Sequence, residues 1–431
     1  MTDTQTRPER ERRPEPTPAE QRAALIRLAL VVAAGVAAAV LTGTTSTVAI
    51  VGAIIVMIML HELGHFVTAK WAGMKVTEYF LGFGPRLWSV RKGETEYGVK
   101  AIPAGGYVKI VGMSNLEKVD PADEERTYRQ KSYPRRLSVA VAGSAVHFVL
   151  AFLLLFTLFA VVGVPAYDRE FTIGQISRLR SGPSPAEEAG LQVGDTVLAV
   201  DGRRLRWDDV PAYIRSRPGR PVVFEVERDG RRLQLTATPV DLSTVQVDGA
   251  PVVEDPDRPV GFVGIGRPIF PIERSDPVTA LGRSAVGLGR ATADTVKALA
   301  TIFSPGGATS YGRQLVGDVE DAEGENRFLS PVGFVRVASQ AADTGWREVL
   351  TLLLAINVFV GVFNMIPLLP LDGGHVAIAT YERIRSRKGR RYHADIAKAM
   401  PVYYMVFLML VFLGISSLYL DIVRPIGNPF Q

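Results

Sequence analysis

The stretch MLHELGHFV, residues 59–67, places two histidines and a glutamate directly behind an apolar run. The 13 residues before His61 carry no charge, and ionisable side chains in such a setting face a polar interior or a ligand. In a helix, His61 and His65 lie four residues apart on one face, so both rings can bind one ion. Glu62 then reaches a water beside that ion. The spacing therefore predicts a membrane helix with a zinc site of the hydrolase type.

The alternative is a chance occurrence of a short pattern, with the two histidines as ordinary surface or core residues. Composition weighs against it: the chain has 431 residues, 47% of them hydrophobic, and a mean hydropathy of +0.15, which is high for a soluble protein. It has no cysteine, so a metal here takes nitrogen and oxygen ligands. A net charge of +5 without a basic stripe interleaved with aromatics indicates that nucleic acid is not a partner.

Five apolar segments approach the ~20 residues that cross a bilayer. Residues 1–22 before them are Pro-rich and charged, which predicts a disordered tail. For the first segment a cleaved signal peptide is the alternative. The segments expected to span the membrane are 23–42, 47–70, 137–165, 346–376 (a transmembrane helix together with the NxxPxxPLDGG motif) and 401–423.

Lysine and arginine are concentrated in two of the connecting loops. The loop at 79–136 carries eleven of them and the loop at 377–400 carries seven. Short loops rich in Lys and Arg lie on the cytoplasmic side. The tail and the HELGH end of the second span are then expected at the cytoplasmic face, and the region between the third and fourth spans outside.

The segments between the spans differ in character. Alternation and Gly-rich breaks within 79–136 predict strands and a hairpin. Residues 171–266 have the pattern of a compact α+β domain. Residues 276–345 are interpreted as an amphipathic helix from Pro277 followed by a linker, with a loop in the acidic stretch at 318–325.

A catalytic zinc usually has three protein ligands, so a third one is expected outside HELGH. The best candidate is Asp372 in NMIPLLPLDGGH, residues 364–375, where prolines and glycines break an apolar helix. Irregular backbone at membrane depth is tolerated where it is buried in protein or lines a watery cavity. The alternative is a simple turn, with Asp372 as the N-cap of a helix beginning near Val376.

With these motifs, the chain resembles the site-2 proteases, which are intramembrane zinc metalloproteases, and especially the bacterial branch typified by the regulator of sigma-E protease. The resemblance runs from Val48 to Leu420 and rests on HELGH, on GFGP…YGVKAIPAGGYVKI and on NMIPLLPLDGG. It implies an α-helical polytopic membrane protein of about five transmembrane helices, one broken near LDGG. It also implies a membrane-associated β-hairpin loop and one extracytoplasmic PDZ domain.

By this resemblance His61, His65 and Asp372 are the ligands of one Zn²⁺ per chain, and Glu62 is the general base. Asn364 matches the family asparagine that holds the substrate backbone or the oxyanion. Gly105 and Gly106 match the hairpin that receives the substrate in extended form. Two features depart from the family: an extra first span, and His147 where many relatives have asparagine. His147 is either a fourth ligand or, as we expect, a buried histidine bonded to a neighbouring helix.

The function expected from the resemblance is intramembrane proteolysis in a bacterial cell membrane. The partners are the lipid bilayer and single-span substrates such as anti-sigma factors already trimmed outside, whose cleavage releases a cytoplasmic fragment. The alternatives are clearance of remnant signal peptides, a non-catalytic PDZ adaptor or chaperone, and a metal transporter. An adaptor has no need of Glu62, and a transporter lacks acidic and histidine residues on the other spans apart from His147.

Overall fold

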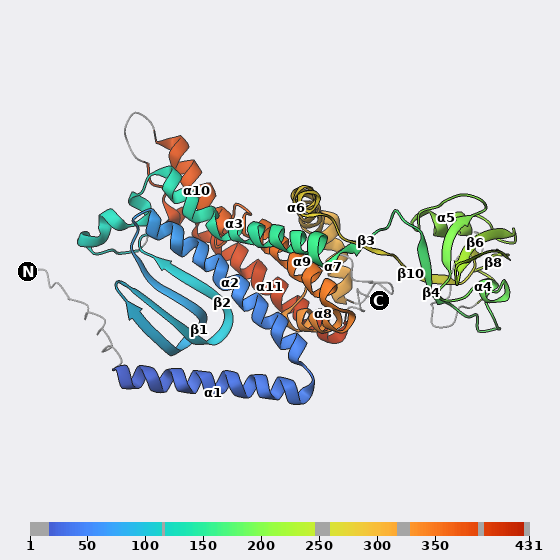
Figure 1. Ribbon diagram of the computed structural model, residues 1–431. Coiled ribbons are helices and arrows are strands. Elements are labelled where there is room, and N and C mark those ends of the chain that lie inside the picture. The colour runs from blue at the N-terminus through green and yellow to red at the C-terminus, as the bar shows by residue number, and fades with distance from the viewer. Residues whose placement is uncertain (1–16, 114–116, 246–258, 317–327, 387–391, 426–431) are drawn as a thin grey trace, which may run out of the picture. The chain divides into compact units, whose positions relative to one another are not determined.

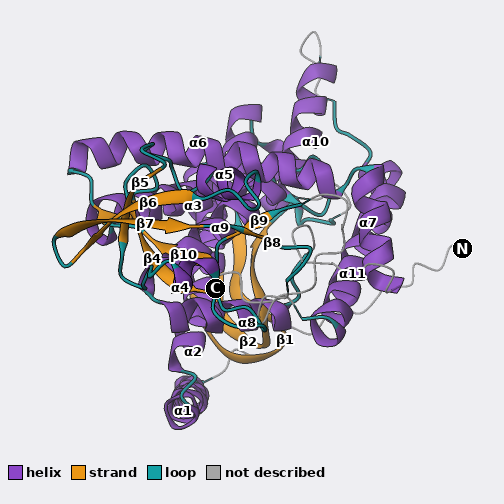
Figure 2. Cartoon of the chain, turned by 90° about the vertical axis from the view of Figure 1, so that its right-hand side faces the viewer, coloured by secondary structure: helices purple, strands orange, loops and turns teal. Residues whose placement is uncertain are grey.

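The chain divides into two compact units. The computed structural model describes residues 17–113, 117–245, 259–316, 328–386 and 392–425. Unit 1 comprises Met1–Thr157 with Leu281–Gln431, and unit 2 comprises Leu158–Ala280. Figure 2 distinguishes the helices from the strands; helices dominate unit 1, whereas strands form the body of unit 2.

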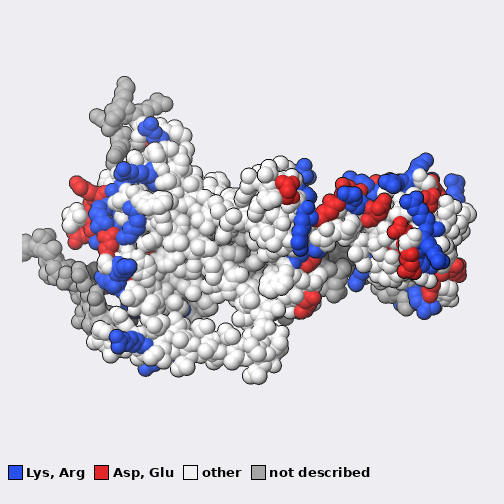
Figure 3. All heavy atoms as spheres, viewed as in Figure 1, with Lys and Arg blue, Asp and Glu red and all other residues white. Residues whose placement is uncertain are grey.

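Five helices among the described residues are long and apolar enough to cross a membrane, which confirms the predicted polytopic helical class. Few of their apolar side chains are buried within the protein, and Figure 3 shows their outer surfaces almost free of charge. These surfaces are suited to lipid contact. The five spans are Pro18–Thr42 (α1), Thr45–Trp71 (α2), Tyr133–Val162 (α3, Tyr133–Thr157, with a π-helical turn, Leu158–Val162), Trp346–Asn364 (α9) and Ile396–Val423 (mainly α11, Met400–Val423).

The first helix begins earlier than expected, inside the segment assigned to the tail. Thr17 caps α1: its hydroxyl accepts from Glu20 N, and the Glu20 carboxylate accepts from Thr17 N at 2.7 Å. Pro18 occupies the first turn, where its missing N–H costs nothing. With this capping box, the helix begins five residues before the predicted start at residue 23. The rest of the 1–22 segment lies outside the described residues.

Helix α3 is the centre of unit 1, because it packs against α2, against α9 and against α10 (Asp372–Arg385) (Figure 1). The segment expected to be a linker after α6 (Pro277–Ile302) forms two further helices, α7 (Pro305–Val316) and α8 (Pro331–Thr344). Helix α8 packs on α2, α9 and α11, and its first turn is fixed by Ser330 N donating to buried Asp421 at 2.7 Å. The acidic stretch at 318–325 lies outside the described residues.

The predicted hairpin forms β1 (Val76–Lys92) and β2 (Thr95–Ile110). Residues 76–83 pair with 95–102 on one side and with 106–110 on the other, so the two long strands fold into a small sheet of four segments. Tyr79 attaches this sheet to α2 by donating from its hydroxyl to the carbonyl of Met59 at 2.8 Å. No other described strand pairs with 106–110, which leaves that edge open.

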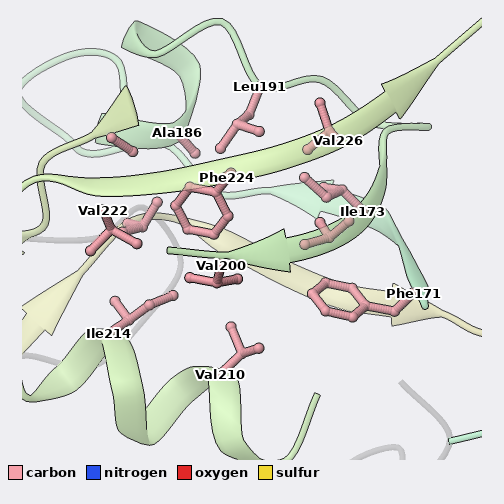
Figure 4. Close-up of a cluster of buried hydrophobic side chains, with 13 residues drawn as sticks. Phe171, Ile173, Ala186, Leu191, Val200, Val210, Ile214, Val222, Phe224 and Val226 are labelled. Carbon is pink, nitrogen blue, oxygen red and sulfur yellow. The ribbon is translucent and has the colours of Figure 1, made fainter. Parts of the chain in front are cut away.

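Unit 2 has a hydrophobic core of its own. Its sheet has the order β10-β4-β5-β6-β7 with antiparallel neighbours: Ile265–Ile269, Phe171–Ile176, Thr196–Val200, Val222–Arg228 and Arg231–Ala237. Helix α5 (Asp209–Arg215) covers the sheet with Val210 and Ile214, and Phe224 lies in the middle of the cluster (Figure 4). The smaller elements are α4 (Pro185–Glu188), β8 (Val240–Asp241) and β9 (Gly261–Phe262), and β3 (Val164–Pro165) pairs with β11 (Ile272–Glu273).

Candidate metal centre

His61, His65 and Asp372 converge from two elements more than 300 residues apart in sequence. One ligand atom of each lies within 4.8 Å of the others. The two histidines come from α2 and are 7% and 5% exposed, and Asp372 is the first residue of α10. Among the described residues, no other group of three or more His, Asp or Glu side chains could hold a metal ion in this way.

The protonation pattern of the cluster fits a bound cation. His65 Nδ1 lies 2.7 Å from the carbonyl oxygen of Val139, which only accepts, so this nitrogen carries the proton. In the neutral ring His65 Nε2 therefore presents a lone pair to His61 Nε2 at 3.2 Å and to Asp372 Oδ2 at 3.2 Å. Asp372 Oδ2 has no hydrogen-bond donor among the described residues. Electron pairs that face one another in a buried site repel unless a cation lies between them.

Gly143 of α3 provides the room in which the two rings meet. A Cβ placed on Gly143 would lie 2.5 Å from His61 Nε2 and closer still to His65 Nε2. Heavy atoms do not approach so closely, so any larger side chain would push the Nε2 atoms of His61 and His65 aside. The neighbouring turns of the same helix supply Val139, whose carbonyl orients His65, and His147.

Asp372 reaches the histidines because the chain turns sharply between α9 and α10. A Cβ on Gly373 would collide with the backbone of Met365 and Ile366, so the turn packs tightly against the start of α10. The N-cap of α10 is Leu371, and Asp372 caps no helix. The alternative of Asp372 as an N-cap before Val376 is therefore wrong, since the helix begins at Asp372 itself.

Glu62 projects toward the sheet rather than into the metal cluster. A Cβ on Gly106 would lie 3.0 Å from Glu62 Cγ and 3.1 Å from Met59 Sδ, so β2 passes directly over this side chain. Gly106 begins the 106–110 segment, which forms the open edge of the sheet. The backbone N–H of Val108 in this segment donates to the Glu62 carboxylate. The structure thus places a carboxylate of the HELGH motif against an edge with which no other described strand pairs.

His147 is bonded to a neighbouring helix, as expected, and does not belong to the three-residue cluster. Its Nδ1 lies 2.9 Å from Asn357 Oδ1 on α9, and its ring centroid is 5.1 Å from that of His61. The amide of Asn357 donates to Leu353 O at 2.8 Å, so its oxygen faces His147 as an acceptor. His147 therefore supports the packing of α3 on α9 next to the cluster.

Asn364 is the last residue of α9, eight residues before Asp372 in sequence. It is half-buried, and its side chain makes no hydrogen bond with another described residue. The structure leaves the amide free and does not test its expected role.

Sequence reasoning missed Gly143, Val139 and Asn357. A signal for the first two was present: Val139, Gly143 and His147 recur every four residues, which marks one face of a helix. A glycine one turn from a histidine in an apolar helix indicates a face that another element approaches closely. For Asn357, the only signal in the sequence was a polar side chain within an apolar segment.

Comparison with known proteins agrees with this geometry. A sequence profile described as "Peptidase family M50" matches residues 49–411. The chain is 32% identical over 398 residues to the zinc metalloprotease Rip1 of Mycobacterium tuberculosis (strain H37Rv), covering 87% of this chain and 96% of that protein. It is 33% identical over 403 residues to the zinc metalloprotease Rip1 of Mycolicibacterium smegmatis, with the same coverage. The region that matches the profile contains all three residues of the metal cluster.

Proposed function

The chain belongs to peptidase family M50, the site-2 proteases, and from this premise we propose that it cuts single-span membrane proteins at the centre formed by His61, His65 and Asp372. It is a multi-pass membrane protein and a zinc metalloendopeptidase with Zn²⁺ as its cofactor. What carries the proposal is the convergence of three lone-pair donors, one of them fixed in its tautomer by Val139, beside the carboxylate of Glu62.

His61, His65 and Asp372 would hold the zinc, and Glu62 would act as the general base. Zinc supplies Lewis-acid chemistry, lowering the pKa of coordinated water and stabilising negative charge on a carbonyl oxygen. The Glu62 carboxylate takes a proton from the attacking water and delivers it to the leaving amine. The unpaired amide of Asn364 is suited to donate a hydrogen bond to the oxyanion or to the substrate backbone.

The open edge of the sheet is suited to hold the substrate as an added strand. A helical substrate hides its carbonyls, so hydrolysis requires an unwound segment. No other described strand pairs with the 106–110 segment, Gly106 lies against Glu62, and the Val108 N–H bonds to the Glu62 carboxylate. A substrate strand paired with this edge would pass the general base with its peptide groups exposed.

The substrate class we propose is single-span proteins already trimmed outside the membrane, with anti-sigma factors as the leading example. Both Lys- and Arg-rich loops support a site near the cytoplasmic face, where a cut releases a cytoplasmic fragment. Clearance of remnant signal peptides uses the same chemistry and remains the second candidate. A non-catalytic adaptor is disfavoured because it would need neither the buried cluster nor Glu62.

The decisive experiment uses purified full-length protein with a synthetic single-span peptide in detergent. Glu62→Gln should keep its zinc and lose cleavage by at least about 100-fold, the scale of general-base removal. Turnover by Glu62→Gln at the rate of the unaltered protein would contradict the assigned mechanism. Loss of zinc from this variant would instead assign a metal-binding role to Glu62.

For unit 2 we propose a PDZ domain that acts as a size gate. Its support is a pattern of short strands and two helices around one core, and its position in the sequence between the third and fourth spans. A gate contributes no affinity for an accepted substrate, whereas a groove that adds a strand lowers the KM. Deleting residues 171–239 with a Gly/Ser bridge should let the enzyme cut untrimmed substrate. Equal loss of cleavage of trimmed and untrimmed substrates in a folded deletion would favour recruitment.

A further inference from the structure

A cavity of about 610 Å³ opens in unit 1 away from the metal cluster. Its walls come from two parts of the chain, residues 129–136 before and at the start of α3, and residues 379–386 at the end of α10 and 392–393 after it. Four basic side chains line it: Arg129, Lys131, Arg136 and Arg383, with the ring of His393 beside them. Figure 3 shows Lys and Arg, with some Asp and Glu among them, at this end of unit 1 near α10 and the start of α3.

The positive charge of this cavity is only partly compensated. Arg129 pairs with Glu124, and Arg136 pairs with Glu382 at 2.5 Å. Lys131 donates only to a backbone carbonyl, at 3.0 Å, and Arg383 makes no ion pair with a described residue. Two cations therefore face the cavity without a partner of opposite charge.

Arg136 places a guanidinium in the cavity wall, although its Nε is itself buried. Its side chain is 10% exposed, and its Nε has no hydrogen-bond acceptor among the described residues. A buried donor on a charged group is costly to leave unpaired. Phosphate oxygens are the acceptors that arginine and lysine bind best.

The cavity lies at the ends of two membrane spans. The span Tyr133–Val162 begins in one wall, and the span Ile396–Val423 begins three residues after His393 in the other. Both walls also belong to the two loops rich in Lys and Arg. A site at this depth meets the head groups of the lipid leaflet on that side.

We propose that this cavity binds the phosphate of an anionic phospholipid head group. The chemistry it recognises is a negatively charged phosphate, and its position at the start of two spans favours lipid over a soluble phosphate compound. A bound lipid would join α3 to α10, the helix that begins with Asp372, without entering the metal cluster. The site is distinct from the proteolytic centre, and its occupancy does not depend on the proposed cleavage.

The test measures binding of a fluorescent short-chain phosphatidylglycerol to the full chain in neutral detergent. Parallel titrations use the phosphatidylcholine analogue and inorganic phosphate. The double variant Lys131→Gln/Arg383→Gln should bind phosphatidylglycerol roughly 30-fold more weakly, and Arg383→Gln alone about 5-fold. Zinc content shows that each variant is folded, and the single variant changes one exposed side chain only, so folding does not obscure the result.

The matched control is Arg135→Gln/Lys398→Gln, which removes the same charge from exposed positions in the same two segments outside the cavity. It should bind phosphatidylglycerol as the unaltered chain does. Equal weakening in both double variants would show a general surface effect and overturn the site, as would equal binding of phosphatidylcholine. If inorganic phosphate binds as tightly as phosphatidylglycerol, the site takes soluble phosphate and the lipid assignment is wrong.

Discussion

The metal cluster of unit 1 and the core of unit 2 are both buried, but they are built in opposite ways. In unit 2, Phe171, Ile173 and Phe224 belong to a group of 13 buried apolar residues that needs no partner beyond its own contacts (Figure 4). In unit 1, His61, His65 and Asp372 bring polar atoms to within 3.3 Å of one another, and atoms of His61 and Asp372 lack hydrogen-bond partners among the described residues. Burial stabilises the first arrangement, whereas the second is completed only by a ligand.

The difference separates stability from chemistry. A hydrophobic core tolerates changes that keep its volume, and removing volume costs free energy of folding. The cluster tolerates no change in position, because its atoms must all lie within reach of one ion. Mutations in the core of unit 2 should therefore alter the stability of that unit and leave the bound zinc in place. Mutations around the cluster should weaken zinc binding and leave the stability of unit 2 unchanged.

The largest effect on stability is expected for Phe224→Ala. Phe224 is fully buried in unit 2, so truncation should destabilise that unit by about 3–5 kcal/mol. Hydrogen exchange of the backbone amides in residues 158–280 of the full chain measures the change. Ile269→Ala is the control, since Ile269 is 57% exposed on β10 and its loss should leave exchange unaltered. Zinc content should stay the same in both variants; its loss in Phe224→Ala would show that the two regions are not independent.

Gly143→Ala tests the cluster by sterics alone. The added methyl group would displace the Nε2 atoms of His61 and His65, so we expect loss of zinc and at least about 100-fold slower cleavage. Metal analysis of the purified protein gives the readout that does not depend on activity. Gly52→Ala on α2 makes the same change where no atom lies within 4 Å, and it should keep both zinc and activity. Full metal content in Gly143→Ala would mean that α3 can retreat from the histidines.

Asp372→Ala should have a smaller effect, because two nitrogen ligands remain. We expect zinc affinity to fall at least about 10-fold, measured by competition with a chelator. Asp395→Ala removes a carboxylate just before another helix, outside the cluster, and should leave affinity unaltered. If the affinity of Asp372→Ala matches that of the control, the third ligand lies elsewhere.

The smallest expected effect is the pH dependence of the stability of unit 2. Burial raises the pKa of the Asp195 carboxyl, but hydrogen bonds from Arg228, at 2.7 and 2.8 Å, and from Gln192 N outweigh it and hold the pKa below its ordinary value. A lowered pKa stabilises the fold above the unfolded value of about 3.9, and this contribution is lost as pH falls further. The protection of unit 2 amides, taken relative to their intrinsic exchange rate at each pH, should therefore fall below about pH 4. Arg228→Gln should reduce this dependence; an unchanged profile would assign it to other groups.

Much of this molecule could be predicted from local sequence. The apolar segments gave the five spans because a bilayer demands about 20 apolar residues wherever a helix crosses it. Alternation in 79–136 predicted the hairpin, and HELGH predicted two histidines on one helical face. The capping box at Thr17 is also a local pattern, and it places the start of α1 five residues before the apolar segment at 23–42.

Other features depend on contacts between distant segments. The segment after α6, which was expected to be a linker, is helical because α8 packs against α2, α9 and α11. Local sequence patterns do not predict these contacts. Gly143 belongs to the site only because α3 packs closely against His61 and His65. The cavity at the start of α3 likewise needs two loops that lie about 250 residues apart in sequence.

The sequence by itself determined which residue types were available for chemistry and at what membrane depth, because helical period and apolar length are local properties. Only the tertiary structure decided that Asp372 meets both histidines, that Val139 fixes the proton on His65, and that the open edge of the sheet passes Glu62. Each of these is a distance between residues remote in the chain. Such distances follow from how helices and strands pack, since close packing leaves one arrangement in which all of these contacts form together.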